Sequence, residues 1–271
     1  MSSWMYAVVQ LPLSVSVWMV IAFSLVMSWL ANHLIRRRWP PPTFKENNEL
    51  LGFTYAVYGL IYGVLLAFTI IVAWEQFAGA ERNVLHETTL LSQLWRDCET
   101  FAPGEGDPIR KDLIAYTDSV LQQEWPAMAA AGRAHPQTQQ IYERLWTNTR
   151  RVRPETSTQE IYLTQFLTRM NELSATRRLR ILDSRMEVHG VLWLVLLLGA
   201  IPAVGYTLLL SAKHSWVQVL NTGFIMMIVL LGLLVTLSLQ YPFTGDVSIH
   251  PVAFQELLDA FKHRLPAPVP P

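Results

Sequence analysis

Two adjacent residues, His86 and Glu87, have the order that opens the zinc-binding helix of many metalloproteases. That motif needs a second histidine four residues after the first, where this sequence has Leu90. The other histidines are scattered, and the sequence contains no phosphate-binding glycine loop, nucleophile elbow or dinucleotide-binding fingerprint. We therefore predict no catalytic residue, no metal site and no cofactor, and we expect that the protein is not an enzyme.

Carboxylates and arginines alternate along the polar region 75–187. Such interleaving is typical of helix faces exposed to solvent, so it predicts solvated side chains there. The only cysteine, Cys98, cannot form a disulfide within the chain, and an ordinary buried thiol is expected rather than a reactive one. The formal net charge is zero, which gives no indication of a nucleic-acid partner.

Four long apolar runs account for the high hydrophobic content of the sequence. Hydrophobic residues make up 51% of the 271 residues and charged residues only 15%, against about a quarter in a typical soluble domain. The runs cover about residues 11–35, 52–74, 188–210 and 216–239. Each is long enough to cross a bilayer core of about 30 Å as a helix. We therefore predict an all-α membrane protein with four transmembrane helices in two pairs, the first of them a retained span and not a signal peptide.

The region between the two pairs, 75–187, has apolar residues at helical spacing and predicts a soluble helical domain. Within it, 103–106 is predicted to form a turn before a helix that starts at Asp107 and ends near Pro126. Ser157 and Glu160 have the spacing of a capping box, which predicts the start of a long helix. That helix has an apolar stripe of Tyr162, Phe166, Met170, Leu173, Leu179, Leu182 and Met186.

The C-terminal tail, 240–271, begins with a turn at Pro242, Phe243 and Gly245. A short amphipathic helix is predicted at 254–264, and the proline-rich end is expected to be extended.

None of the four spans contains Asp, Glu, Lys or Arg between its ends. Proton-driven motors, proton-coupled transporters and intramembrane proteases need ionisable groups at membrane depth. Their absence from the spans argues against these three classes of membrane protein. The remaining hydroxyl groups of the spans more often bond a neighbouring helix than a substrate.

Gly59 and Gly63, in the second span, form a Gly-x-x-x-Gly pair, which lets another helix approach closely. The partner helix is expected either in the same subunit or in a neighbouring one. Leu60, Val64 and Phe68 recur every four residues, so they lie on one face of the same helix. This stripe either packs against lipid or the protein core, or forms an apolar pore constriction that gates by dewetting.

The sequence resembles the bestrophin-like membrane proteins, in particular their bacterial relatives of unknown function. The resemblance covers most of the chain and depends on the order of four segments: Trp74-Glu75-Gln76-Phe77-Ala78-Gly79-Ala80, Glu124-Trp125-Pro126-Ala127-Met128, Arg177-Arg178-Leu179-Arg180-Ile181-Leu182 and Pro242-Phe243-x-Gly245.

Bestrophins are pentameric anion-selective channels whose second helix lines the pore with an apolar neck and continues into a cytosolic helical domain. The resemblance implies that Leu60, Val64 and Phe68 occupy the neck positions. Two features differ from the family pattern. The stretch 69–73 is nearly all apolar where bestrophins have polar residues, and only Asp246 follows the last turn, so no calcium clasp is expected.

We therefore expect a homo-oligomer in the lipid bilayer, most simply a pentamer, which acts as an ion channel or channel-like pore with passive conductance of an inorganic anion. The alternative is a non-conducting membrane scaffold or signalling subunit that acts through its helical soluble domain. The uncharged N-terminal segment, with Arg36, Arg37 and Arg38 at the far end of the first span, favours an outside N-terminus. The resemblance implies instead a multi-pass protein of the bacterial inner membrane, with the termini and the soluble domain in the cytosol.

Overall fold

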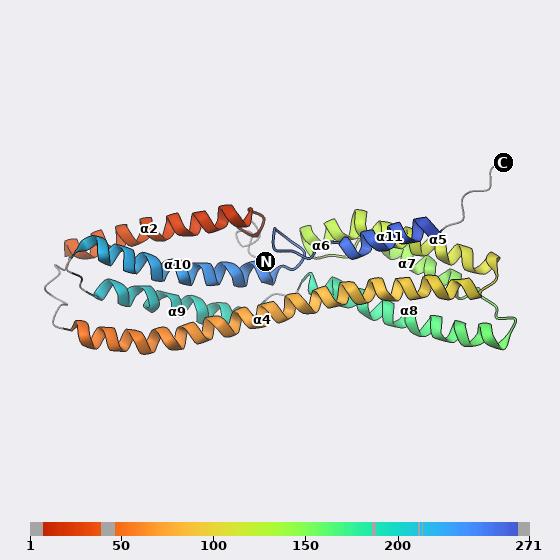
Figure 1. Ribbon diagram of the computed structural model, residues 1–271, viewed down its shortest axis with the longest axis horizontal. Helices are drawn as coiled ribbons and strands as arrows, with labels where there is room; N and C mark the ends of the chain where they lie inside the picture. The colour runs from red at the N-terminus through yellow and green to blue at the C-terminus, as the bar shows by residue number, and fades with distance from the viewer. Residues whose placement is uncertain (1–7, 39–46, 186–187, 211, 213, 265–271) are drawn as a thin grey trace. The chain divides into compact units, whose positions relative to one another are not determined.

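The computed structural model describes residues 8–38, 47–185, 188–210, 212 and 214–264, so the proline-rich end lies outside the described residues. Within these ranges all regular structure is helical and no β-strand is present (Figure 1). The chain forms two compact units, each assembled from separate segments. The first unit takes the described residues of Met1–Phe77, Glu187–Tyr241 and Gly245–Val247, and the second takes those of Ala78–Met186, Pro242–Thr244 and Ser248–Pro271.

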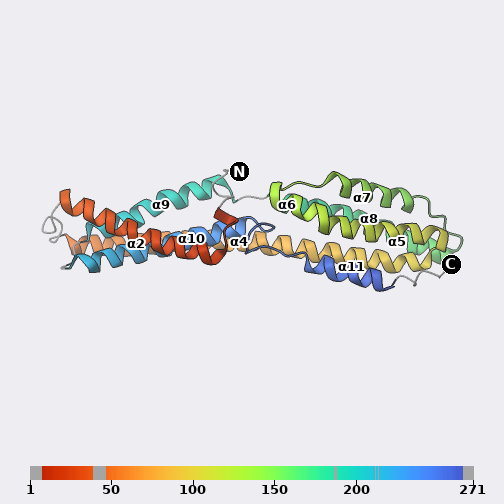
Figure 2. The same ribbon diagram turned by 90° about the horizontal axis from the view of Figure 1, so that it is seen from above.

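Four long apolar helices build the first unit. They are α2 (Leu13–Arg38), the N-terminal part of α4 (Asn48–Asp97), α9 (Gly190–Leu209) and α10 (Ser215–Gln240). Figure 1 shows them side by side, and Figure 2 shows the same group from above. Each helix is long and apolar enough to cross a membrane, so the prediction of four spans is confirmed.

Hydroxyl groups join neighbouring helices inside this unit. Ser28 of α2 donates from Oγ to the carbonyl of Val219 in α10 at 2.6 Å. Thr207 of α9 and Thr222 of α10 bond through their hydroxyls at 3.1 Å. With no water in a bilayer core, polar groups of a span must find partners within the protein. These hydroxyls therefore contribute to helix packing.

α4 packs against α9 and α10 through one apolar face. Tyr62 and Leu66 of α4 lie in a buried cluster with residues of both other helices, namely Leu196, Ala203, Val229 and Leu233. Two glycines allow this close approach. A Cβ at Gly199 would lie 2.6 Å from the ring of Tyr62, and a Cβ at Gly232 would lie 2.6 Å from Leu66. A larger residue at Gly199 would therefore displace the ring of Tyr62, and one at Gly232 would displace the end of the Leu66 side chain.

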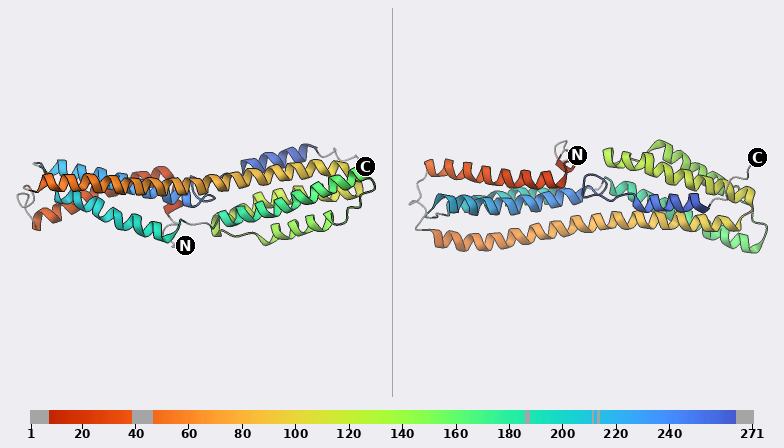
Figure 3. Two further views of the ribbon diagram at one scale, coloured as in Figure 1. Left: turned by 90° about the horizontal axis from the view of Figure 1, so that it is seen from below. Right: turned by 45° about the horizontal axis from the view of Figure 1, so that its top comes forward.

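The second unit contains the rest of α4 and a set of shorter helices (Figure 3). These are the 3₁₀-helix η1 (Cys98–Thr100), α5 (Pro103–Ser119), the π-helix η2 (Val120–Glu124), α6 (Trp125–Ala131), α7 (Pro136–Thr149), α8 (Ser157–Asp183) and α11 (Val252–Arg264).

The predicted turn at 103–106 is wrong, because α5 begins at Pro103. Proline at the first helical position loses no bond, since the N–H groups of the first turn have no acceptor within the helix. The carbonyl of Ala102 then accepts from the N–H of Gly106 at 2.8 Å and closes the first turn. Gly106 allows a close approach to η1, because a Cβ there would lie 2.6 Å from the carbonyl oxygen of Cys98.

The helix also does not end near Pro126 as predicted. The chain passes through the π-turn Val120–Glu124, in which the N–H of Trp125 bonds the carbonyl of Val120, and continues as α6. Pro126 then occupies the start of α6, where a proline is tolerated. The end comes at Gly132, which adopts φ +58°, a left-handed conformation that glycine adopts without strain.

The capping box predicted at Ser157 is shifted by one residue. Thr156 is the N-cap of α8, and its side chain accepts from the N–H of Gln159. At the end of the chain, α11 is part of the core of the second unit. Phe254 and Phe261 are buried, and the ring of Phe261 stacks on Trp95 at 4.4 Å.

Candidate functional site

The stripe of Leu60, Val64 and Phe68 is exposed on the protomer, with exposed fractions of 70%, 46% and 63%. An α-helix turns about 100° per residue, so Leu60 and Val64 lie roughly opposite Tyr62 on α4. Tyr62 is the residue that faces α9 and the buried cluster. The stripe therefore points away from the core of its own unit.

Gly59 and Gly63 lie between the buried face and the exposed stripe. No heavy atom of the described residues lies within 4 Å of a Cβ placed on either glycine. Close helix packing at this pair is therefore not provided by the described part of the protomer. Packing against a neighbouring subunit stays a prediction.

The apolar stretch after the stripe is divided between two faces of α4. Ala73 is fully buried, and Ile70 packs with it against a cluster that includes Val188 and Leu239. Only Ile71 and Val72 of this stretch are exposed. The core of the first unit thus accounts for Ile70 and Ala73 of this stretch.

The turn that follows α10 is ordered by contacts on both sides of Thr244. Phe243 is buried, and its ring meets Trp125 edge-on at 5.3 Å within the second unit. Two of the segments that support the family resemblance therefore touch. Gly245 has φ +82°, and a Cβ there would lie 2.3 Å from the carbonyl oxygen of Val9 within the first unit.

Asp246 accepts a hydrogen bond from the N–H of Leu13 at 2.8 Å, at the start of α2. Its carboxylate thus caps a helix N-terminus, where negative charge is favourable.

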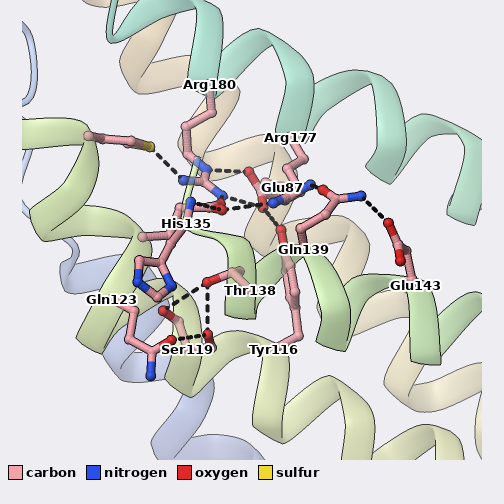
Figure 4. A network of polar contacts seen from close by, with 12 residues as sticks. Glu87, Tyr116, Ser119, Gln123, His135, Thr138, Gln139, Glu143, Arg177 and Arg180 are labelled. Atoms are coloured by element: carbon pink, nitrogen blue, oxygen red, sulfur yellow. Dashed lines mark hydrogen bonds and ion pairs between the residues drawn. The ribbon is translucent and has the colours of Figure 1, made fainter. Parts of the chain in front are cut away.

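The second unit contains a buried ionic network, which is shown from close by in Figure 4. Arg180 of α8 donates from Nε to Oε2 of Glu87 at 2.6 Å and from Nη2 to Oε1 of Glu124 at 2.8 Å. Arg177 donates from Nη2 to Oε2 of Glu124 at 2.7 Å. Tyr116 donates to Oε1 of Glu87 at 2.5 Å. The side chains of Glu87, Glu124 and Arg180 are entirely buried.

Two carboxylates and two guanidinium groups balance the charge of the network. Burial by itself would raise the pKa of Glu124, but the neighbouring Arg180 and Arg177 outweigh it and hold that pKa below its ordinary value. Burial would lower the pKa of Arg180, but the nearby carboxylates raise it well above the ordinary value. Burial, followed by the charge of Glu87, raises the pKa of Tyr116, so the phenol keeps the proton that it donates.

This network has little capacity for chemistry. All four carboxylate oxygens of Glu87 and Glu124 already accept hydrogen bonds, so neither carboxylate is available as a base. In the described part of the chain, no group of three or more His, Cys, Asp or Glu side chains is arranged to hold a metal ion. The network is therefore suited to fixing α4, α8 and the π-turn together.

The expectation of solvated carboxylates and arginines is wrong at these positions. The buried face of α8 includes Phe166, Met170, Leu173, Arg177 and Arg180. The predicted stripe members Tyr162, Leu179 and Leu182 are exposed, and Met186 lies outside the described residues. The sequence did contain a signal for the burial of Arg177 and Arg180, because both arginines continue the three- and four-residue spacing of the buried apolar residues. The π-turn that brings Glu124 to them has no sequence pattern that we recognise.

Comparisons with known proteins agree with this architecture. No curated protein matches the sequence. A bacterial bestrophin homologue from Klebsiella pneumoniae, solved by zinc phasing, has a TM-score of 0.67 at 16% identity, over 92% of this chain and 99% of that one. A single-substitution variant of a Klebsiella pneumoniae bestrophin homologue gives 0.68 at 15% identity, over 91% and 99% of the two chains. At this identity the structures show the fold alone. The sequence itself matches the model of the Bestrophin-like domain over residues 19–254, so the chain belongs to the bestrophin-like family of membrane proteins.

Proposed function

We propose that this protein forms an oligomeric channel, most simply a pentamer, with passive conductance of inorganic anions through a neck of Leu60, Val64 and Phe68. One observation supports it above others: the stripe is exposed and lies on the face of α4 opposite Tyr62. These residues lie on one line of the helix and do not pack against the core of their own unit, so they are free to face a neighbouring subunit. The family relationship agrees with a channel.

In the proposed neck, each layer is a ring of one apolar side chain from every subunit. An ion that enters such a ring loses hydration and gains no polar partner, so the constriction excludes water until it widens. Spans without Asp, Glu, Lys or Arg agree with passive flow, which needs no titrating relay. The burial of Ala73 and the packing of the partly buried Ile70 against the same cluster remove part of the conflict between an apolar run and a wetted pore.

The test is the conductance of purified protein in planar bilayers under a chloride gradient. Replacing the stripe with alanine (Leu60→Ala, Val64→Ala and Phe68→Ala together) should raise basal current, because the barrier to wetting falls. A matched control replaces three exposed residues that share a face of α9, Leu194→Ala, Leu198→Ala and Ile201→Ala, and should leave the current unchanged. Native mass measurement establishes the oligomer in each case.

A non-conducting scaffold is the second candidate, and the exposure of Ile71 and Val72 just after the stripe favours it. If the parent and the triple alanine variant both form an intact oligomer and neither passes current, the scaffold function replaces the channel function. A protein that is only monomeric in mild detergent would exclude both the neck and the channel.

We also propose that the termini and the second unit face the cytosol of a bacterial inner membrane. Arg133, in the loop between α6 and α7, is exposed and suits a single reporter. An Arg133→Cys variant should resist membrane-impermeant thiol reagents in intact cells and react after lysis. Labelling from outside would reverse the orientation.

A further inference from the structure

Pro202 lies inside α9, in the middle of the apolar segment. Proline has no N–H and its ring crowds the carbonyl four residues earlier, so the helix bond to the carbonyl of Leu198 is missing. A bilayer supplies no water to support a helix weakened in this way, so contacts with a neighbouring helix stabilise this part of α9.

Two tyrosines of α4 provide donors at this part of α9. Tyr58 donates from its hydroxyl to the carbonyl of Gly199 at 2.6 Å, and Tyr62 donates to the carbonyl of Leu196 at 3.2 Å. The two rings are stacked with an interplanar angle of 6°, and the ring of Tyr206 lies 6.1 Å from that of Tyr58. The hydroxyl bonds and the ring contacts therefore hold the same two side chains, Tyr58 and Tyr62, in place.

The fit at Gly199 restricts how α4 can move. Tyr62 is buried, and its ring lies where a Cβ of residue 199 would be, at 2.6 Å. Rotation of α4 about its axis would break both hydroxyl bonds and drive the ring into α9. Since Leu60 and Val64 lie roughly opposite Tyr62, such a rotation would also turn the exposed stripe.

We propose that Tyr58 and Tyr62 form a clamp that holds α4 at one rotation on the segment 196–199 of α9, just before Pro202, and thereby directs Leu60, Val64 and Phe68 away from the core of their own unit. Both tyrosines are positioning residues in this role. The role at the neck rests on the proposed channel function, whereas the clamp itself does not.

The clamp is tested first within the protomer. The double variant Tyr58→Phe, Tyr62→Phe keeps both rings and removes both hydroxyls. Hydrogen exchange of the α9 segment 196–203, followed by mass spectrometry in nanodiscs, should become about threefold to tenfold faster, the range expected for a hydrogen bond within a membrane. Tyr55→Phe is the matched control, because the Tyr55 hydroxyl makes no hydrogen bond among the described residues while its ring contacts Tyr206. Equal exchange in the parent, the double variant and the control would overturn the clamp.

The second arm follows the direction of the stripe. A Val64→Cys variant should form disulfide-linked copies on mild oxidation, and the double tyrosine change should reduce that yield at least threefold while Tyr55→Phe does not. The native Cys98 is buried, and burial raises its pKa to about 12, so it adds little background. An unchanged yield would overturn the directing role. If Val64→Cys gives no linked copies even in the parent, the proposed neck fails, and hydrogen exchange still decides the clamp.

Discussion

Arg180 and Glu87 are joined by two hydrogen bonds, from Nε to Oε2 at 2.6 Å and from Nη2 to Oε1 at 3.1 Å, and both side chains are fully buried. Taking such a pair out of water is costly, and good geometry roughly offsets that cost. Removal of one partner is different, because it leaves a buried charge without compensation. The network therefore makes the second unit sensitive to single substitutions.

Arg180→Met is expected to destabilise the second unit by about 3–5 kcal/mol, since Glu87 would keep a buried charge without its main partner. The measurement is thermal unfolding of the detergent-solubilised protein. Arg178→Met is the control, because Arg178 is exposed on the same helix and should change stability by less than about 0.5 kcal/mol. Adding Glu87→Gln to Arg180→Met should recover part of the loss, and a further loss would contradict the unpaired-charge explanation.

Asp183→Asn is expected to stabilise the second unit at neutral pH. Burial raises the pKa of Asp183, and the hydrogen bond from Asn83 at 2.7 Å only partly opposes it. With a raised pKa in the folded state, the native protein loses stability as the pH rises from the unfolded value, about 3.9, through the folded value. The advantage of asparagine should therefore be present at pH 7 and vanish below about pH 4. A gain of the same size at both pH values would mean that charge is not the cause.

Gly106→Ala and Gly104→Ala should have opposite effects, although the two positions lie in the first turns of α5. A Cβ at Gly106 would lie 2.6 Å from the carbonyl oxygen of Cys98, so alanine must force η1 and α5 apart. No atom of the described residues lies within 4 Å of a Cβ placed on Gly104, so alanine there should stabilise the helix by about 0.5–1 kcal/mol. Thermal unfolding of the two variants should show Tm falling in the first and rising slightly in the second. If Tm changes equally in the two variants, η1 can move away from α5 without loss of stability.

Phe243→Ala should cost about 3–5 kcal/mol, because it leaves a cavity beside Trp125. Phe243→Leu retains most of the apolar volume and loses the edge-on ring contact, so about 0.5–1.5 kcal/mol is expected from that contact. Denaturant unfolding monitored by tryptophan fluorescence separates the two. A leucine variant as unstable as the alanine variant would indicate that ring shape matters more than volume at this position.

The membrane spans were predictable because hydrophobic length is a local property of the sequence. Residues 216–239, for example, were expected to span, and α10 covers Ser215–Gln240. The family, too, followed from short segments in the right order. Burial of charge was not predictable in this way, because Glu87 and Glu124 become neutralised only by arginines that are distant in sequence.

Local patterns also failed where two of them competed. Asp107 and Pro108 have good helix-start chemistry, but Pro103 offers the same advantage five residues before Pro108, and the close approach at Gly106 favours the earlier start. The exposed stripe of α4 was recognised from its spacing alone. Only the tertiary contacts with α9 show that Tyr62, on the opposite side of the helix, faces the core.

The π-turn Val120–Glu124 is equivalent to one extra residue inserted into an α-helix, since its bonds span five residues where an α-helix uses four. Deleting one residue there would restore a regular helix and leave the composition almost unchanged. The deletion would also shift Glu124 relative to Tyr116, so that Glu124 could no longer bond Arg177 and Arg180 while Tyr116 bonds Glu87. Related chains without this residue would need a different carboxylate to neutralise the buried arginines. In an alignment of related chains, a one-residue gap at this point would thus separate chains whose buried arginines pair with different carboxylates.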